Sequence, residues 1–242
     1  MINMKNNKAV MFMHVATPVI GNNHAYNTTY ERIIKDIVEK GNKSGLFDYI
    51  DYVHFNVVGD LPFPEHLLNF DNYKITRVGN LLDYELPTLR LLRDFVDNNK
   101  DYKVLYTQTL SVSTWNWNDP KMMDRRNMHF YFSIENFLKC IEKLETHDSC
   151  GANWNKDMRD GYEDYVPHYS GNIWWANAEY LSKLPTIDWI INPENFILDY
   201  RHQAEFWIGM DEKHKHFNFF SWADIEKENA LPLERYKDCI NK

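Results

Sequence analysis

Hydrophobic stretches of two kinds alternate along the first 145 residues. The first kind is short and continuously apolar, as in Ala9–Val15, which is followed by a polar Thr-Pro pair. Such a run predicts an interior strand of a parallel sheet, because these strands are buried on both faces. The second kind repeats every three to four residues. In Thr28–Lys40 it places isoleucine and valine side chains on one stripe, which predicts a helix.

The same two patterns predict the remaining elements. Further strands are expected at Tyr49–Val58, Lys74–Val78, Lys103–Thr107 and Ile173–Ala176. Further helices are expected at Leu86–Val96, Pro120–Leu144, Ala178–Leu184 and Arg201–Ile208. The alternation favours βαβ units, so the predicted fold class is α/β, with a central, mostly parallel mixed sheet flanked by helices. Residues 1–242 contain no internal repeat and no Gly/Ser linker, and they are expected to form a single domain.

Ligands of such sheets bind beyond the carboxyl ends of the strands. The residues at the ends of three predicted strands are therefore the first candidates for a site: 14–17, 56–60 and 107–111.

Charge and cysteine content narrow the class of protein. The formal net charge is -8 and no long Lys/Arg run occurs, which argues against nucleic acid as a partner but leaves room for a small anion bound by a few arginines. The three cysteines are an odd number without tight spacing, which is typical of a reducing, cytoplasmic setting. The apolar run at Ala9–Val15 is too short to span a membrane and lacks the flanks of a signal peptide. We therefore expect no membrane span.

One segment carries a specific motif. Residues 168–176 read His-Tyr-Ser-Gly-Asn-Ile-Trp-Trp-Ala, and Glu-Tyr-Leu follows at 179–181. This resembles a group of GT-A-type glycosyltransferases with the motif H-[FY]-S-G-N-F-W-W-A followed by a Tyr-Leu helix. Four further segments resemble that group in the same order: Ser44–Phe47, Glu85–Leu89, Arg125–Phe132 and Arg201–Trp207. The resemblance extends from about residue 9 to residue 208.

The resemblance implies a GT-A-like, Rossmann-like fold and an enzyme that moves a sugar from a nucleotide-sugar donor to a hydroxyl of a glycan or glycoconjugate, as in glycan biosynthesis. The chain departs from the group after the third strand, where Y-x-H-T-K-G is replaced by Tyr106-Thr-Gln-Thr-Leu-Ser111. The alternative is therefore a catalytically inactive relative that binds glycans or nucleotide sugars.

Glycosyl transfer needs a cradle for the diphosphate leaving group, and most GT-A enzymes use a divalent cation held by carboxylates. No Asp-x-Asp follows the third strand here, where Thr107, Gln108 and Thr109 are neutral. We therefore expect a metal-independent site without a cofactor, with Mn²⁺ as the alternative. The residues expected to bind the nucleotide are His14, Thr17, Thr107, Gln108 and Arg125. The alternative for His14 is a histidine of the core, and the alternative for Arg125 is a solvated arginine on a helix face.

The motif and the segment after it supply the remaining candidates. The residues expected to bind the substrates are His168, Ser170, Gly171, Asn172, Trp174, Trp175 and Arg201. Of the two tryptophans, which point to opposite faces of a strand, one is expected in the core and the other against a sugar, unless both pack inside. Glu205 is the candidate general base. Its alternative role is a helical ion pair with Arg201, four residues earlier.

Overall fold

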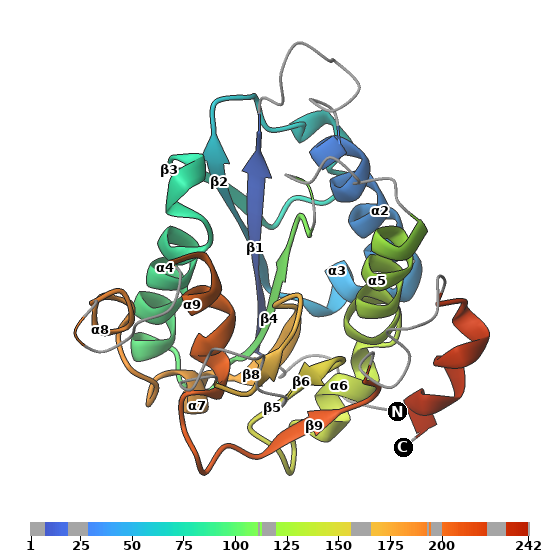
Figure 1. Cartoon of the computed structure of the whole chain (residues 1–242). Coiled ribbons are helices and arrows are strands. Elements are labelled where there is room, and N and C mark those ends of the chain that lie inside the picture. The colour runs from blue at the N-terminus through green and yellow to red at the C-terminus, as the bar shows by residue number, and fades with distance from the viewer. Residues whose placement is uncertain are drawn as a thin grey trace.

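The computed structural model describes residues 8–18, 29–110, 112, 120–155, 166–192, 194, 200–221 and 231–241, with the backbone alone at 200–202. Seven of the described strands form one sheet in the order β3-β2-β1-β4-β8-β5-β9 (Figure 1). Only β8 runs antiparallel to its two neighbours, and every other pair in the sheet is parallel. The predicted fold class, a mostly parallel mixed sheet flanked by helices, is confirmed.

The strands of this sheet differ greatly in length. They are β1 (Ala9–Thr17), β2 (Tyr52–Gly59), β3 (Tyr73–Gly79), β4 (Lys103–Gln108), β5 (Ser149–Gly151), β8 (Trp174–Asn177) and β9 (His216–Asn218). A separate two-stranded ribbon pairs β6 (Trp154–Asn155) with β7 (His168–Tyr169).

Helices cover both faces of the sheet (Figure 1). The α-helices are α2 (Thr29–Ser44), α3 (Leu46–Tyr49), α4 (Leu86–Asn98), α5 (Pro120–Phe130), α6 (Phe137–Lys143), α7 (Ala178–Leu181), α8 (Ile187–Ile190) and α9 (Tyr200–Phe206). Short helical turns complete the list: η1 (Glu65–Leu67), η2 (Leu81–Asp83), η3 (Tyr131–Glu135), η4 (Trp207–Gly209), η6 (Leu233–Arg235) and η7 (Lys237–Asn241).

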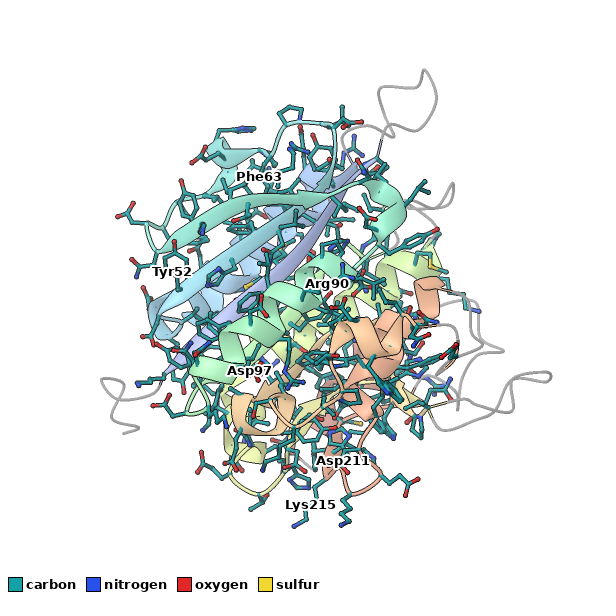
Figure 2. The ribbon with its side chains drawn as sticks, turned by 90° about the vertical axis from the view of Figure 1, so that its left-hand side faces the viewer. Tyr52, Phe63, Arg90, Asp97, Asp211 and Lys215 are labelled. Carbon is teal, nitrogen blue, oxygen red and sulfur yellow. The ribbon has the colours of Figure 1, made fainter. Side chains whose placement is uncertain are left out.

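The side chains of the interior strands β1, β4 and β8 alternate between two hydrophobic clusters. On β1, Met11, Met13 and Val15 pack against the helices of one face, including α2, α5 and α6. Val10 and Phe12 pack against the other face, which is covered by α4, α7, α8 and α9. Figure 2 shows α4 lying over the sheet on this second face. Because both faces are covered, β1 is apolar throughout, as predicted for an interior strand.

Two expectations about the elements are wrong. The single helix expected from Pro120 to Leu144 is interrupted by the π-helical turn Tyr131–Glu135 and by Asn136, whose φ of -119° and ψ of 32° are not helical. The strand expected from Tyr49 begins only at Tyr52, because Tyr49 ends helix α3. No helix within the described ranges has the length and apolar character needed to cross a bilayer.

Candidate functional site

A pocket of about 370 Å³ opens at the carboxyl ends of β1, β2 and β4. This volume lies within the range of small-molecule sites, and its place at the carboxyl ends of parallel strands is where such sheets bind ligands. The lining residues are His14, Ala16, Pro18, Val58, Leu81, Leu82, Tyr84, Glu85, Gln108, Thr109, Leu110, Val112, Met122, Arg125 and Glu205.

Three segments outside the sheet complete this lining. Residues 81–85 precede α4, Met122 and Arg125 lie on α5, and Glu205 lies on α9. Helices α4 and α5 cover opposite faces of the sheet (Figure 1). The pocket therefore draws its side chains from both faces at the strand ends.

A tight turn at residues 170–172 holds four of the polar lining side chains. Each is joined to the turn by a hydrogen bond: Arg125 Nη2 donates to Ser170 Oγ at 2.8 Å, Gln108 Nε2 donates to the Gly171 carbonyl at 2.9 Å, the Gly171 N–H donates to Glu205 Oε2 at 3.3 Å, and Asn172 Nδ2 donates to Glu85 Oε2 at 2.6 Å. One turn thus positions a guanidinium, an amide and two carboxylates of the same pocket.

The sequence Gly171-Asn172 suits this turn. Gly171 has φ +105° and Asn172 has φ +49°, conformations that glycine adopts freely and asparagine tolerates. A Cβ on Gly171 would lie 2.7 Å from Nε2 of His129, which is fully buried on α5. The Asn172 N–H donates to the carbonyl of Tyr169 at 2.8 Å and closes the turn. Glycine is therefore required at 171 for both its conformation and its lack of a side chain.

Glu205 lines the pocket. Its side chain is 22% exposed, and its Oε2 lies 3.6 Å from Nε2 of His168. His168 is buried, its Nδ1 is 3.0 Å from the Val166 carbonyl, and its ring packs edge-on against Phe206. Because both neighbours of the carboxylate are fixed, Glu205 has a defined position beside Gly171. The Arg201 side chain lies outside the described residues, so the predicted ion pair stays a prediction.

Arg125 also lines the pocket, whereas its neighbour Arg126 is buried and its Nη1 donates to the Leu110 carbonyl at 3.4 Å. The fully buried His129 lies near Arg125, and burial, reinforced by the charge of Arg125, lowers its pKa to about 3. His129 is therefore neutral at physiological pH and adds no positive charge beside this arginine.

The strand-end candidates for nucleotide binding have different positions. His14 lines the pocket, its Nδ1 is 2.9 Å from Thr88 Oγ1, and burial lowers its pKa to about 3. Gln108 also lines the pocket. Thr17 and Thr107 are fully buried and outside the lining, and the Thr17 hydroxyl donates to the Val58 carbonyl at 3.1 Å. Neither threonine is therefore placed to contact a ligand in this pocket.

The motif residues at 168–175 are not among the lining residues of this pocket, so their direct contact with a substrate stays a prediction. Trp174 and Trp175 are both fully buried, because their strand is covered by helices on both faces. Trp174 stacks on Tyr106 with ring centroids 5.1 Å apart, and Trp175 donates to the Ser133 carbonyl. Neither ring has an exposed face for a sugar. Four residues of the motif instead contact side chains that line the pocket: His168, Ser170, Gly171 and Asn172.

Sequence reasoning missed Glu85 as a site residue. Its carboxylate Oε2 accepts from Tyr106 OH at 2.7 Å as well as from Asn172 Nδ2, and burial with the charge of this carboxylate raises the pKa of Tyr106. The preceding residue, Tyr84, has φ +47° and ψ -134°, a strained conformation at the pocket wall. The signal that the sequence offers is the segment Glu85–Leu89, which belongs to the resemblance and lies at the start of the predicted helix Leu86–Val96.

The histidines near β9 are not part of this pocket. His214 stacks on Tyr180 with centroids 4.5 Å apart, and His216 stacks on Trp154 at 4.1 Å. Burial lowers the pKa of His214 to about 3. Among the residues that the structure describes, no three His, Cys, Asp or Glu side chains are grouped as a metal site would require.

No protein-family model matches the chain, and a comparison with curated proteins gave no match. Among solved structures, a provisionally assigned nucleotide-diphospho-sugar transferase from Desulfovibrio desulfuricans G20 is similar at 11% identity, with 89% of this chain and 80% of that chain covered and a TM-score of 0.46. A 4-diphosphocytidyl-2C-methyl-D-erythritol synthase from Anaerococcus prevotii DSM 20548 is 13% identical, with 98% and 96% covered and a TM-score of 0.47. A further 4-diphosphocytidyl-2C-methyl-D-erythritol synthase is 12% identical, with 98% and 99% covered and a TM-score of 0.41.

Proposed function

We propose that this chain is a glycosyltransferase that moves a sugar from a nucleotide-sugar donor to a hydroxyl of a glycan or glycoconjugate. The observation that carries the proposal is the pocket at the carboxyl ends of the strands, in which one turn positions Arg125 together with Glu85 and Glu205. This turn lies in the segment 168–176 that resembles the motif of GT-A glycosyltransferases.

Glu205 is the proposed general base. In the reaction, the acceptor oxygen forms a bond to the anomeric carbon, the bond from that carbon to the diphosphate breaks, and the acceptor proton passes to the carboxylate. The half-buried position of Glu205 and the hydrogen bond from the Gly171 N–H support this role, because the carboxylate is fixed at the pocket while part of it remains accessible.

Arg125 is the proposed partner of the diphosphate leaving group. A guanidinium donates paired hydrogen bonds to phosphate oxygens and compensates the negative charge that develops as the bond breaks. We further propose that nucleotide binding does not require a divalent cation. The neutral side chains of Gln108 and Thr109 at the end of β4 support this, with Mn²⁺ as the alternative.

One observation favours a second function, that of an inactive relative that binds glycans or nucleotide sugars. Gln108 stands in the segment that departs from the group, and its amide donates to the Gly171 carbonyl. The side chain thus has a structural role where the group has a histidine, and this replacement supports the alternative of a binding protein.

A thermal-shift screen of UDP, GDP, dTDP and CMP, with and without Mn²⁺, tests the proposed donor class, because a nucleotide that binds the native state raises its melting temperature. We expect one nucleotide to bind in the absence of metal. Arg125→Gln should weaken that binding by about tenfold or more. The matched control is Arg90→Gln, on the exposed side of α4 (Figure 2), where the arginine pairs with Asp188. Failure of all four nucleotides to bind, or equal loss in both variants, would contradict the proposal.

A further inference from the structure

The proposed mechanism leaves one carboxylate of the pocket without a role. Glu85 is 9% exposed and lines the pocket together with Glu205. Burying an ionised carboxylate is costly unless hydrogen bonds or charges compensate it. A glutamate kept in this position, at the wall of a cavity, is therefore a candidate for contact with the ligand.

Three features of the surroundings favour the ionised form of Glu85. Its Oε2 accepts hydrogen bonds from Tyr106 OH at 2.7 Å and from Asn172 Nδ2 at 2.6 Å. Glu85 is also the N-cap residue of α4, a helix of 13 residues, so the positive end of the helix dipole faces it. Each of these contacts stabilises an ionised carboxylate more than a protonated one.

The charged side chains of the described lining do not balance. Glu85 and Glu205 are negative, Arg125 is positive, and His14 is neutral, since burial holds its pKa at about 3. Glu85 is hydrogen-bonded to Tyr106, and burial together with the charges of Glu85 and Glu205 raises the pKa of this phenol. The described lining therefore contains two carboxylates and one arginine.

We infer that Glu85 determines specificity for the transferred sugar: it accepts hydrogen bonds from sugar hydroxyls, admits neutral or amino sugars, and excludes sugars that carry a carboxylate. This inference rests on the proposed function. A hydroxyl or an ammonium group donates to a carboxylate favourably, whereas a second carboxylate in the same partly desolvated pocket is repelled. The excluded class comprises uronic acids and sialic acid. Arg125 does not reverse this selection, because the donor's diphosphate occupies it.

The test uses donor pairs that differ only at C6 of the sugar: UDP-glucose with UDP-glucuronic acid, and GDP-mannose with GDP-mannuronic acid. Affinities are measured by calorimetric titration, with UDP and GDP as references. For the pair whose nucleotide binds, the wild type should prefer the neutral member by about tenfold or more. Glu85→Gln should reduce the preference to within about threefold of equality without changing the affinity for the free nucleotide.

Two further variants separate charge from shape. Tyr106→Phe removes one hydrogen bond to Glu85 but keeps its carboxylate and the hydrogen bond from Asn172, so most of the preference should persist. Glu179→Gln removes an exposed carboxylate that pairs with Lys183 on α7 and should have no effect. The wild-type preference should also weaken as NaCl is raised, a measurement that needs no variant.

The outcomes distinguish this inference from the proposed function. Equal binding of the neutral and acidic donors by the wild type, or an unchanged preference in a folded Glu85→Gln protein, would overturn the role of Glu85 while leaving nucleotide-sugar binding intact. Tighter binding of the acidic donor would overturn it as well. If neither the sugars nor the free nucleotides bind, the proposed function fails and this inference fails with it.

Discussion

Substitution of Gly171 by alanine tests the turn that organises the pocket. Two costs add at this position. A residue with a side chain is strained at φ +105°, which costs about 1–3 kcal/mol. The new Cβ would also lie 2.7 Å from His129 Nε2, and this ring is fully buried, so it cannot move aside without disturbing its own packing. Overpacking of that kind costs about 1–3 kcal/mol, and the expected total is about 2–6 kcal/mol.

The matched control is Gly45→Ala. Gly45 has φ +77° and ψ 16°, but an added Cβ would meet no atom within 4 Å. The substitution should therefore cost only the conformational penalty of a left-handed residue, about 1–2 kcal/mol. The difference between the two variants isolates the contact with His129. In a His129→Ala background this contact is gone, so the added cost of Gly171→Ala should fall to the conformational part.

Urea denaturation followed by tryptophan fluorescence measures these free energies, and the affinity of the preferred nucleotide measures the effect on the pocket. Gly171→Ala should weaken nucleotide binding, because Gln108 and Glu205 are bonded to the backbone of this residue. Equal destabilisation by the two glycine substitutions, or a cost of Gly171→Ala that is undiminished in the His129→Ala background, would refute the reasoning about the turn.

Three further predictions concern chemistry, metal and pH. Glu205→Gln should lower kcat by about 10²–10⁴-fold with little change in nucleotide affinity. If Glu205 only pairs with Arg201, Glu205→Gln and Arg201→Gln should each lower stability by under about 1 kcal/mol and leave turnover intact. Titration of the preferred nucleotide in EDTA should give unchanged affinity, and an affinity that only Mn²⁺ restores would show a metal site. His14 and His129 are neutral in the folded protein, where burial lowers the pKa of each from 6.5 to about 3, but they take up protons near pH 6.5 when unfolded. The stability that each neutral histidine contributes to the folded state is therefore fully present above pH 6.5 and is lost as the pH falls toward 3. Between pH 7 and pH 5 the free energy of unfolding should fall by about 2 kcal/mol per histidine. Denaturation of His129→Asn at both pH values should show a smaller loss than the wild type, and an equal loss would contradict this assignment.

The long elements of the fold were predictable from the sequence, because a hydrophobic pattern, continuous in β1 and periodic in α2 and α4, extends over 8–16 residues in β1, β2, α2 and α4. The short strands β5, β6, β7 and β9 have only two or three residues each, too few for any period to appear. Their pairing is fixed by tertiary contacts. The break at Asn136 was missed for a similar reason, since an uninterrupted helical pattern runs through it.

The site was predictable only in part. Strand-end reasoning located His14 and Gln108, and the resemblance pointed to Glu205 and Arg125, all of which line the pocket. The motif at 168–176 is expected to contact the substrate, which stays a prediction; its residues 170–172 are hydrogen-bonded to four lining side chains, a contact that the motif alone does not predict. The contact of Glu85 with Tyr106 and Asn172 joins positions 21 and 87 residues apart, a proximity that local patterns do not contain.

The central claim, transfer of a sugar from a nucleotide donor, is tested most directly by the release of nucleotide from donor sugars. Each nucleotide sugar that binds would be incubated with the protein, with and without glycan acceptors, and the free nucleotide quantified. The account predicts release that rises with acceptor, is lost in Arg125→Gln and is retained in Arg90→Gln. Donors that bind in the pocket and are never cleaved, with any acceptor and with or without Mn²⁺, would contradict the claim and identify the chain as a binding protein.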